Sequence, residues 1–303
     1  MNWNDIKIFL ELARSERLSV AAKRLLMDAS TVSRRLHKLE EQLDTKLFER
    51  TIDGHTLTLE GTKLLSHASK MEQAANIAFE DIQSSNEDNC GRVRIGITEA
   101  FGSFFIAQHL VPLQQAFPKI SIDLLHFSRF VKISRNEADI AIAVERPKGT
   151  SMIVTKLCDY KLQLYADKKY LAQTSIALTL EHITQHKWVS YIDNLLFTEQ
   201  LSYLKELSSR LAAPLEPNFS STSIISQFNA IKSGLGIGIL PCFLADQDKG
   251  LVKILTKEVD IVRTFWLVTH PESKRLSHVE TVWEYLKQSV KEHEYQLMPP
   301  NID

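Results

Sequence analysis

Residues 18–40 read LSVAAKRLLMDASTVSRRLHKLE, a stretch that predicts two short helices meeting at a polar turn near Asp28. In the second helix Ser30, Arg34 and Lys38 fall on one side. The opposite side carries Val32, Leu36, Leu39 and Leu43 at helical spacing. A helix that contacts DNA buries one stripe to be held rigid, while its other stripe offers donors and positive charge to bases and phosphates. The stretch is therefore typical of a helix-turn-helix.

The residues before this stretch predict a supporting helix. Apolar side chains recur at helical spacing from Trp3 to Ala13, and Asn2 or Asn4 is suited to cap the start. We expect Ser19 to cap the second helix and Asp28 to cap the third. Taken alone, the pattern leaves open an amphipathic helix with a solvated basic face.

Residues 51–58, TIDGHTLT, favour a β-hairpin directly after the third helix. Asp53-Gly54 is a hairpin-turn signal between two short β-prone runs. A hairpin in this place is typical of a winged helix-turn-helix, in which the wing contacts the backbone or minor groove. Arg50, His55 and Thr56 are therefore candidate DNA contacts.

Composition sets outer limits on the class of protein. The chain has 303 residues, 44% hydrophobic and 24% charged, enough for two or three globular domains. Its net charge is −1, and the first sixty residues hold ten Lys and Arg against ten Asp and Glu, so any basic surface must be local. Cys90, Cys158 and Cys242 are far apart and fit neither a complete disulfide framework nor a zinc ribbon. No leader or membrane span is evident, and we expect a cytoplasmic protein that is neither secreted nor anchored.

The N-terminal residues resemble those of LysR-type transcriptional regulators. The matching positions are Phe9, Ala21, Ala22, Leu25, Thr31 to Ser33, Leu39, Glu40, Leu47 to Arg50, Leu57, Thr58 and Gly61. The chain departs from the family at Asp28-Ala29-Ser30, where Ser-Gln-Pro or similar is usual. Ala29 lacks the bidentate adenine contact of a glutamine, so we expect a changed half-site preference. The candidate DNA contacts are Ser19, Ser30, Thr31, Ser33, Arg34, Arg35, Lys38, Arg50, His55 and Thr56.

Residues 59–84 predict one long helix without proline. Its apolar positions alternate at spacings of four and three, which indicates a heptad seam for pairing with a second copy. The predicted seam residues are Leu64, Ala68, Met71, Ala75, Ala78 and Ile82. The alternative is a surface helix lying on its own domain. The polar residues 86–91 then mark a hinge.

The rest of the chain predicts strands that alternate with helices, and hence a parallel sheet covered by helices. Strands are expected over 93–98, 120–125 and 140–144, with a helix over 104–117 and another short helix before 140. A second unit begins near Leu162, and the chain returns to the first near 265–269. In such sheets ligands bind beyond the carboxyl ends of the strands.

This region resembles the two-lobed effector domain of the same family, which is related to periplasmic binding proteins. The loosely matching motifs are 137–142 and the glycine-rich 234–241. The resemblance places an effector between the lobes, and each hydroxyl residue there has helix capping as its alternative role. Glu99 disfavours a simple carboxylate effector unless Arg129 or Arg146 neutralises it, and suits an amine. The candidate effector contacts are Thr98, Glu99, Ser103, Phe127, Ser128, Arg129, Arg146, Ser220, Ser221 and Thr222.

Patterns for catalysis or cofactors are weak. His182 and His186 have the spacing of metal ligands on a helix, but no further ligand stands nearby, so a solvated helix face is the better interpretation. Gly234, Gly236 and Gly238 resemble a dinucleotide loop yet follow a helix, which favours a buried strand. Cys90 and Cys242 are the candidates for redox sensing, though no cation adjoins them. We expect no catalytic residue, no metal and no cofactor.

Together these patterns predict a multi-domain α/β chain with three parts. Residues 1–58 form a winged helix-turn-helix, 59–89 a dimerisation helix and hinge, and 90–303 a two-lobed effector domain. The lobes are expected over about 90–161 with 268–303, and about 162–267. The predicted function is sequence-specific regulation of transcription, modulated by a small molecule. The expected partners are promoter DNA, the effector, further copies in a homodimer or homotetramer and, as a candidate, RNA polymerase. The alternative is a small-molecule-binding protein whose N-terminal domain serves only assembly.

Overall fold

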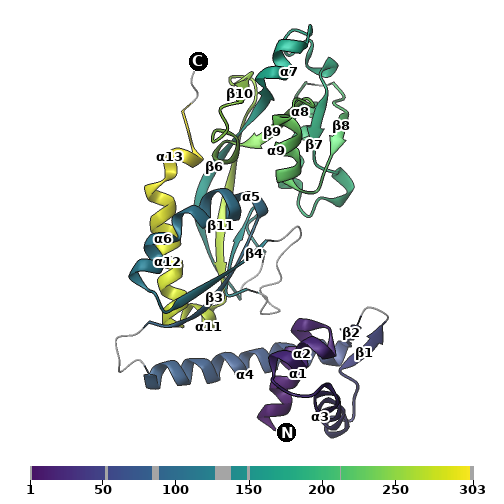
Figure 1. The fold of residues 1–303 in the computed structure, drawn as a ribbon, viewed down its shortest axis with the longest axis vertical. Helices are drawn as coiled ribbons and strands as arrows, with labels where there is room; N and C mark the ends of the chain where they lie inside the picture. The colour runs from purple at the N-terminus through teal and green to yellow at the C-terminus, as the bar shows by residue number, and fades with distance from the viewer. Residues whose placement is uncertain are drawn as a thin grey trace. The chain divides into compact units, whose positions relative to one another are not determined.

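The computed structural model describes residues 2–51, 54–83, 89–126, 138–148, 151–211 and 213–300. The chain divides into two compact units, each considered by itself (Figure 1). The elements of the first unit are α1 (Trp3–Ser15), α2 (Leu18–Arg24), α3 (Ala29–Gln42), β1 (Phe48–Thr51), β2 (Gly54–Leu57) and α4 (Leu59–Gln83).

The ends of the first three helices follow the capping signals in part. The Asn2 side chain accepts a hydrogen bond from the Asn4 amide at 3.0 Å and caps α1. Asp28 occupies the N-cap of α3, as predicted, although its side chain makes no capping hydrogen bond. The prediction for Ser19 is wrong, because α2 begins at Leu18 with Arg17 in the capping position. Ser19 lies exposed in the first turn of α2.

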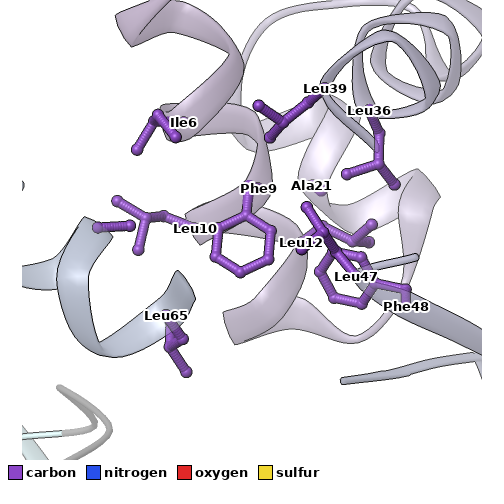
Figure 2. Packing of buried hydrophobic residues seen from close by; sticks show 11 residues of the cluster. Ile6, Phe9, Leu10, Leu12, Ala21, Leu36, Leu39, Leu47, Phe48 and Leu65 are labelled. Carbon is purple, nitrogen blue, oxygen red and sulfur yellow. The ribbon is translucent and has the colours of Figure 1, made fainter. Parts of the chain in front are cut away.

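One apolar core holds the first unit together (Figure 2). The Phe9 ring packs on the Phe48 ring with centroids 5.4 Å apart, which ties α1 to the first strand of the hairpin. Leu36 and Leu39 enter this core from α3, and Val32 is buried beside Ile8. Leu43 does not complete the buried stripe. It is 38% exposed because it is the C-cap residue, where the helix ends.

The predicted hairpin is confirmed. β1 and β2 pair antiparallel, with Phe48 opposite Leu57 and Thr51 opposite Gly54. The amide of His55 donates to the carbonyl of Glu16 at 2.7 Å, which fastens β2 to the end of α1. Gly54 has φ +148°, and a Cβ there would lie 2.4 Å from the Glu16 carbonyl oxygen. Only glycine allows this close approach of two backbones.

α4 begins on its own domain. Leu65 and Ala68 are buried in the core of the first unit, and Arg14 on α1 forms an ion pair with Glu72. The prediction that Ala68 faces a second copy is therefore wrong, and Leu64 is half-buried on the same side. The alternative of a helix lying on its own domain holds for this first part. Figure 1 shows the second half of α4 running beyond the three short helices.

The second unit is a nine-stranded sheet covered by helices, in the order β4-β3-β5-β11-β6-β9-β7-β8 with β10 beside β6. β3 runs parallel to β4 and β5, and β7 runs parallel to β8 and β9, as predicted. The sheet is nevertheless mixed, because β6, β10 and β11 pair antiparallel with their neighbours. The strands are β3 (Gly91–Ile97), β4 (Ile120–His126), β5 (Ile140–Ala143), β6 (Ile153–Asp167), β7 (Trp188–Ser190), β8 (Pro217–Ser220), β9 (Ile237–Pro241), β10 (Leu251–Ile254) and β11 (Asp260–Thr269). The α-helices are α5 (Glu99–Phe101), α6 (Val111–Ala116), α7 (Lys168–Gln173), α8 (Tyr203–Leu211), α9 (Ile224–Lys232), α10 (Cys242–Ala245), α11 (Pro271–Lys274), α12 (Ser277–Glu292) and α13 (Glu294–Leu297).

Two long antiparallel strands connect the lobes of this sheet. β6 and β11 run beside each other from one lobe into the other (Figure 1), and their register shifts between Phe265 and Trp266. A bulge increases local bending and twist. Because β6 continues from Ile153 to Asp167, the transition between lobes falls within strands rather than in a loop.

The first helical run of the second unit differs from the predicted helix over 104–117. Helical structure already begins at Glu99 and passes through a π-helical turn, Gly102–Ile106, and a 3-10 turn, Ala107–His109, before α6. A Cβ on Gly102 would lie 2.7 Å from His126 Nε2, so this turn packs closely on the end of β4. The short helix expected before residue 140 lies outside the described residues.

Candidate nucleic-acid interface and ligand cleft

The outer face of α3 presents hydroxyl and basic side chains to solvent. Ser30, Arg34 and Lys38 are exposed, and Thr31 and Ser33 are half-exposed. Within the described parts of the chain, Arg34 and Lys38 form no ion pair, while the neighbouring His37 lies 3.3 Å from Glu41. Donors and unpaired charge on one rigid face are what base edges and phosphates require.

Arg35 belongs to the scaffold of this unit. Its guanidinium lies 3.6 Å from the carboxylate of Asp5, a residue that is 5% exposed on α1. A buried carboxylate needs a partner, and Arg35 supplies one. We therefore correct the prediction for Arg35, which joins α3 to α1 instead of facing outward.

The wing offers two exposed side chains next to α3. Arg50 and Thr56 are exposed, and Arg50 lies opposite His55 in the hairpin. The His55 ring is half-buried and packs edge-on against Phe48, with ring centroids 6.3 Å apart. His55 therefore stabilises the hairpin as well as lying beside the candidate contact Arg50.

Glu40 fixes the connection between α3 and the wing. Its carboxylate is buried and accepts hydrogen bonds from the Leu47 amide at 2.8 Å, from the Phe48 amide and from Lys46 Nζ at 2.8 Å. Burial alone would raise the pKa of Glu40, but these hydrogen bonds outweigh it and hold the pKa below its ordinary value. The wing is thus held at a defined angle by a charged side chain on α3.

A cavity of about 270 Å³ lies between the lobes of the second unit. Its polar end is formed by Thr98 and Glu99 at the start of α5, by His126 at the end of β4, and by Thr222 and Ser223 before α9. The remaining lining is apolar or aromatic: Ala100, Val144, Tyr160, Tyr191, Phe197, Leu201, Tyr203, Ile224, Pro241, Phe243 and Phe265. The cavity is suited to a small molecule with one polar end.

One hydrogen bond crosses the cleft between the lobes. The Ser223 hydroxyl donates to the carboxylate of Glu99, at 2.9 Å from Oε2 and 3.2 Å from Oε1. The same Oγ accepts from the Ser226 amide and caps α9. Ser223 belongs to the hydroxyl-bearing run 220–223 but was not among the predicted contacts. Its position directly before a helix was the feature of the sequence that could have identified it as a cleft residue.

The tyrosines of the cleft remain neutral. Burial raises the pKa of Tyr160 and of Tyr191 well above the ordinary value, and the nearby Glu99 carboxylate adds to the effect on Tyr191. Burial also raises the pKa of Tyr203, to about 12. These hydroxyls therefore act as uncharged hydrogen-bonding groups at neutral pH. Sequence patterns missed them because Tyr160 on β6, Tyr191 after β7 and Tyr203 at the start of α8 are far apart in the sequence.

The structure places the predicted effector residues in three groups. Thr98, Glu99 and Thr222 line the cavity. Ser103, Arg146, Ser220 and Ser221 do not: Arg146 stacks on the Trp266 ring at 5.4 Å, and Ser221 accepts a hydrogen bond from the Ser223 amide. These four predictions are corrected. Phe127, Ser128 and Arg129 lie outside the described residues.

The patterns weighed for metal and redox chemistry have structural roles. His186 is buried with Nδ1 facing the Tyr170 hydroxyl at 3.1 Å, and His182 precedes a 3-10 turn, so the two do not share a helix face. Gly238 lies within the buried strand β9, as predicted, whereas Gly236 precedes the strand and Gly234 lies in the turn after α9. Burial raises the pKa of Cys242 to about 11, which disfavours a reactive thiolate.

Two family models together match most of the chain. One described as "Bacterial regulatory helix-turn-helix protein, lysR family" matches residues 3–62. Another described as "LysR substrate binding domain" matches residues 86–291. The chain belongs to the LysR family. It is a DNA-binding transcriptional regulator with an effector-binding domain.

Two transcriptional regulators are similar to this chain along most of their length. The chain is 23% identical over 248 residues to the HTH-type transcriptional regulator PtxR of Pseudomonas aeruginosa, covering 82% of this chain and 79% of PtxR. It is 28% identical over 242 residues to the iron-regulated virulence regulatory protein IrgB of Vibrio cholerae, covering 80% of each.

Solved structures show the same fold. A full-length OxyR variant from Pseudomonas aeruginosa superposes with a TM-score of 0.74 at 18% identity, covering 95% of both chains. CrgA from Neisseria meningitidis, a LysR-type transcriptional regulator, superposes with a TM-score of 0.60 at 21% identity, covering 96% of this chain and 99% of CrgA. Within the described residues, no helix combines the length and the apolar character needed to cross a membrane.

Proposed function

We propose that this LysR-family regulator contacts promoter DNA through the outer face of α3 and the wing. The observation that carries the proposal is the exposed set Ser30, Arg34 and Lys38, whose cations are unpaired within the described residues, on a helix buried along its opposite stripe. Ser19, Thr31, Ser33, Arg50 and Thr56 extend this surface. Ala29 is exposed at the start of α3 and offers no hydrogen bond, so base recognition rests on its neighbours.

The regulator acts as an oligomer, we infer, through the second half of α4. Met71 and Ala78 are exposed and Ala75 is half-exposed along this part of the helix. Small residues allow two helices to approach closely. Two recognition helices joined in this way enter successive major grooves about 34 Å apart. Of the predicted seam residues, the side chain of Ile82 lies outside the described residues. A homotetramer then forms through the effector domains.

The cavity between the lobes is the proposed effector site. It combines a polar end with an aromatic wall, and its lining comes from both lobes. A ligand shifts the regulator between states only by its differential affinity for them, typically about 1–3 kcal/mol. In this proposal the protein works in the cytoplasm, contacts RNA polymerase at promoters and catalyses no reaction. Its three parts are the winged helix-turn-helix 1–58, the dimerisation helix and hinge 59–89, and the effector domain 90–303.

A gel-shift assay tests the DNA-binding proposal. The full chain is titrated against the DNA upstream of its own gene in the presence of excess unrelated duplex. We expect a discrete shifted complex, and we expect Lys205→Ala, which removes an exposed cation from α8, to leave it unchanged. No shift, or a shift abolished by unrelated DNA, would instead favour a small-molecule-binding protein whose N-terminal unit serves assembly.

A further inference from the structure

A carboxylate of the chain itself occupies the N-terminal end of α9. Ser223 is the N-cap of this nine-residue helix, and its hydroxyl donates to Glu99 at 2.9 Å. The N-terminus of a helix attracts negative charge because its amides are unpaired and its dipole is positive there. Glu99 therefore places a negative charge beside the end of α9 to which an anionic ligand would otherwise be drawn.

The charges around the cavity reinforce this exclusion of anions. In the part of the lining that the structure describes, no lysine or arginine is present. Arg146 follows the lining residue Val144 by two positions but stacks on Trp266. Arg263 forms an ion pair with Glu206, and its guanidinium lies over the Tyr203 ring. Glu99 itself forms no ion pair with a described residue. Among the residues that the structure describes, the lining thus presents one carboxylate with no cation paired to it.

Aromatic rings make up much of the remaining lining. Tyr160 and Phe265 stack with centroids 4.2 Å apart, and Phe243 meets Tyr160 edge-on at 5.9 Å. Phe265 also stacks on Phe101 at 4.1 Å, so both of its faces are covered and these rings offer a ligand a rigid apolar surface. An acid at one end and rings along the wall form a complementary surface for an ammonium group on an apolar skeleton.

We propose that the effector cleft takes an organic monocation, an alkylammonium or arylalkylammonium. Its ammonium group pairs with Glu99 in place of the Ser223 hydroxyl, and its apolar part lies against Tyr160, Phe243 and Phe265. This inference rests on the proposed function, in which the cleft is the effector site. Because the Glu99 to Ser223 hydrogen bond joins the two lobes, a cation that replaces it changes how the lobes are held together.

Calorimetric titration of the full chain with three matched probes tests the ligand class. The probes are 2-phenylethylamine, 2-phenylethanol and phenylacetate, which share a ring and differ in charge. Titration at about pH 8 keeps the amine charged. We expect the amine to bind at least about tenfold more tightly than the alcohol, and phenylacetate to bind most weakly. This comparison uses the wild-type protein and needs no variant.

Two variants test whether the charge of Glu99 is responsible for the preference for the amine. Glu99→Gln is expected to remove the preference for the amine over the alcohol. Glu145→Gln is the matched control, because Glu145 accepts a hydrogen bond from Thr198 but does not line the cavity. We expect the Glu145→Gln protein to keep the preference for the amine. Binding of phenylacetate as tight as that of the amine, no binding of any probe in the millimolar range, or an amine preference that survives Glu99→Gln would overturn the inference.

The same probes separate this inference from the proposed function. Amine binding with no effect on the complex with promoter DNA would contradict the effector role and leave the cation site standing. A DNA complex that responds to phenylacetate and not to the amine would leave the effector role standing and contradict the ligand class.

Discussion

Arg34 and Arg35 follow one another in α3, yet their guanidinium groups have different surroundings. Arg34 is exposed and unpaired among the described residues, whereas Arg35 lies against the buried Asp5. Adjacent helical residues point about 100° apart, so one faces outward and the next faces the scaffold. Charge alone therefore does not identify a DNA contact in this helix, and the direction of each side chain decides its role.

Arg50 on the wing is expected to contact phosphate. Arg50→Ala should weaken binding to specific and unrelated DNA alike, and should lower the slope of log affinity against log salt by about one. Anisotropy titrations of the full chain at several salt concentrations measure both quantities. Thr56→Ala, which alters the exposed wing without removing a charge, is the control. An unaltered slope in Arg50→Ala would exclude the phosphate contact.

Glu40 is expected to stabilise the wing in a pH-dependent manner. Its pKa is lowered in the folded chain, so its contribution is complete above the ordinary value of 4.5 and is lost as the pH falls through the folded value. Glu40→Gln should cost about 1–3 kcal/mol near neutral pH, because the Leu47 amide and Lys46 lose a charged acceptor.

Hydrogen exchange of the Leu47 and Phe48 amides in the full chain measures the effect of Glu40→Gln. The difference in protection between wild type and variant should shrink as the pH is lowered from about 6 to about 3. A difference that stays constant over this range would show that the charge of Glu40 does not hold the wing.

At the scale of elements, α4 changes its role along its length. Its first turns complete the core of the DNA-binding unit through Leu65 and Ala68, and its later turns leave Met71 and Ala78 exposed. A heptad pattern alone does not reveal where one role ends, because burial in the chain's own core and burial against a second copy need the same residue types.

A matched pair of substitutions separates the two parts of α4. Ala78→Glu should shift the chain toward monomers without unfolding it, because like charges would meet in the proposed seam. Ala68→Glu should destabilise the first unit by about 3 kcal/mol or more, because a charge would enter a packed core. Sedimentation velocity and thermal unfolding measure the two effects. An Ala78→Glu protein with an unchanged sedimentation coefficient would contradict the seam.

The elements were more predictable from sequence than the side chains that line the cleft. Periodicity predicted α3, the hairpin and strands such as Ile120–His126, because one apolar stripe or an alternating run specifies each of them. Ser223 and Tyr160 were missed because elements distant in sequence, α9 and β6, bring them to the same cavity. Arg146 was misplaced because the sequence does not show that it stacks on Trp266.

At the scale of the whole molecule, one chain carries a DNA-binding unit and a two-lobed unit with a ligand cavity. The long strands β6 and β11 make the two lobes one sheet, so the lobes are connected by shared strands and not by a loose linker. Membership in the LysR family gives both units their functions.

The central claim is that α3 recognises the sequence of the promoter. The most direct test compares the affinity of the full chain for the DNA upstream of its own gene with that for a scrambled duplex, at physiological salt. The wild type should prefer its own site by about 10³ or more. Arg34→Ala should reduce this preference by about fivefold to 150-fold, while Lys205→Ala preserves it. An undiminished preference in Arg34→Ala, or equal affinity of the wild type for both duplexes, would contradict the account.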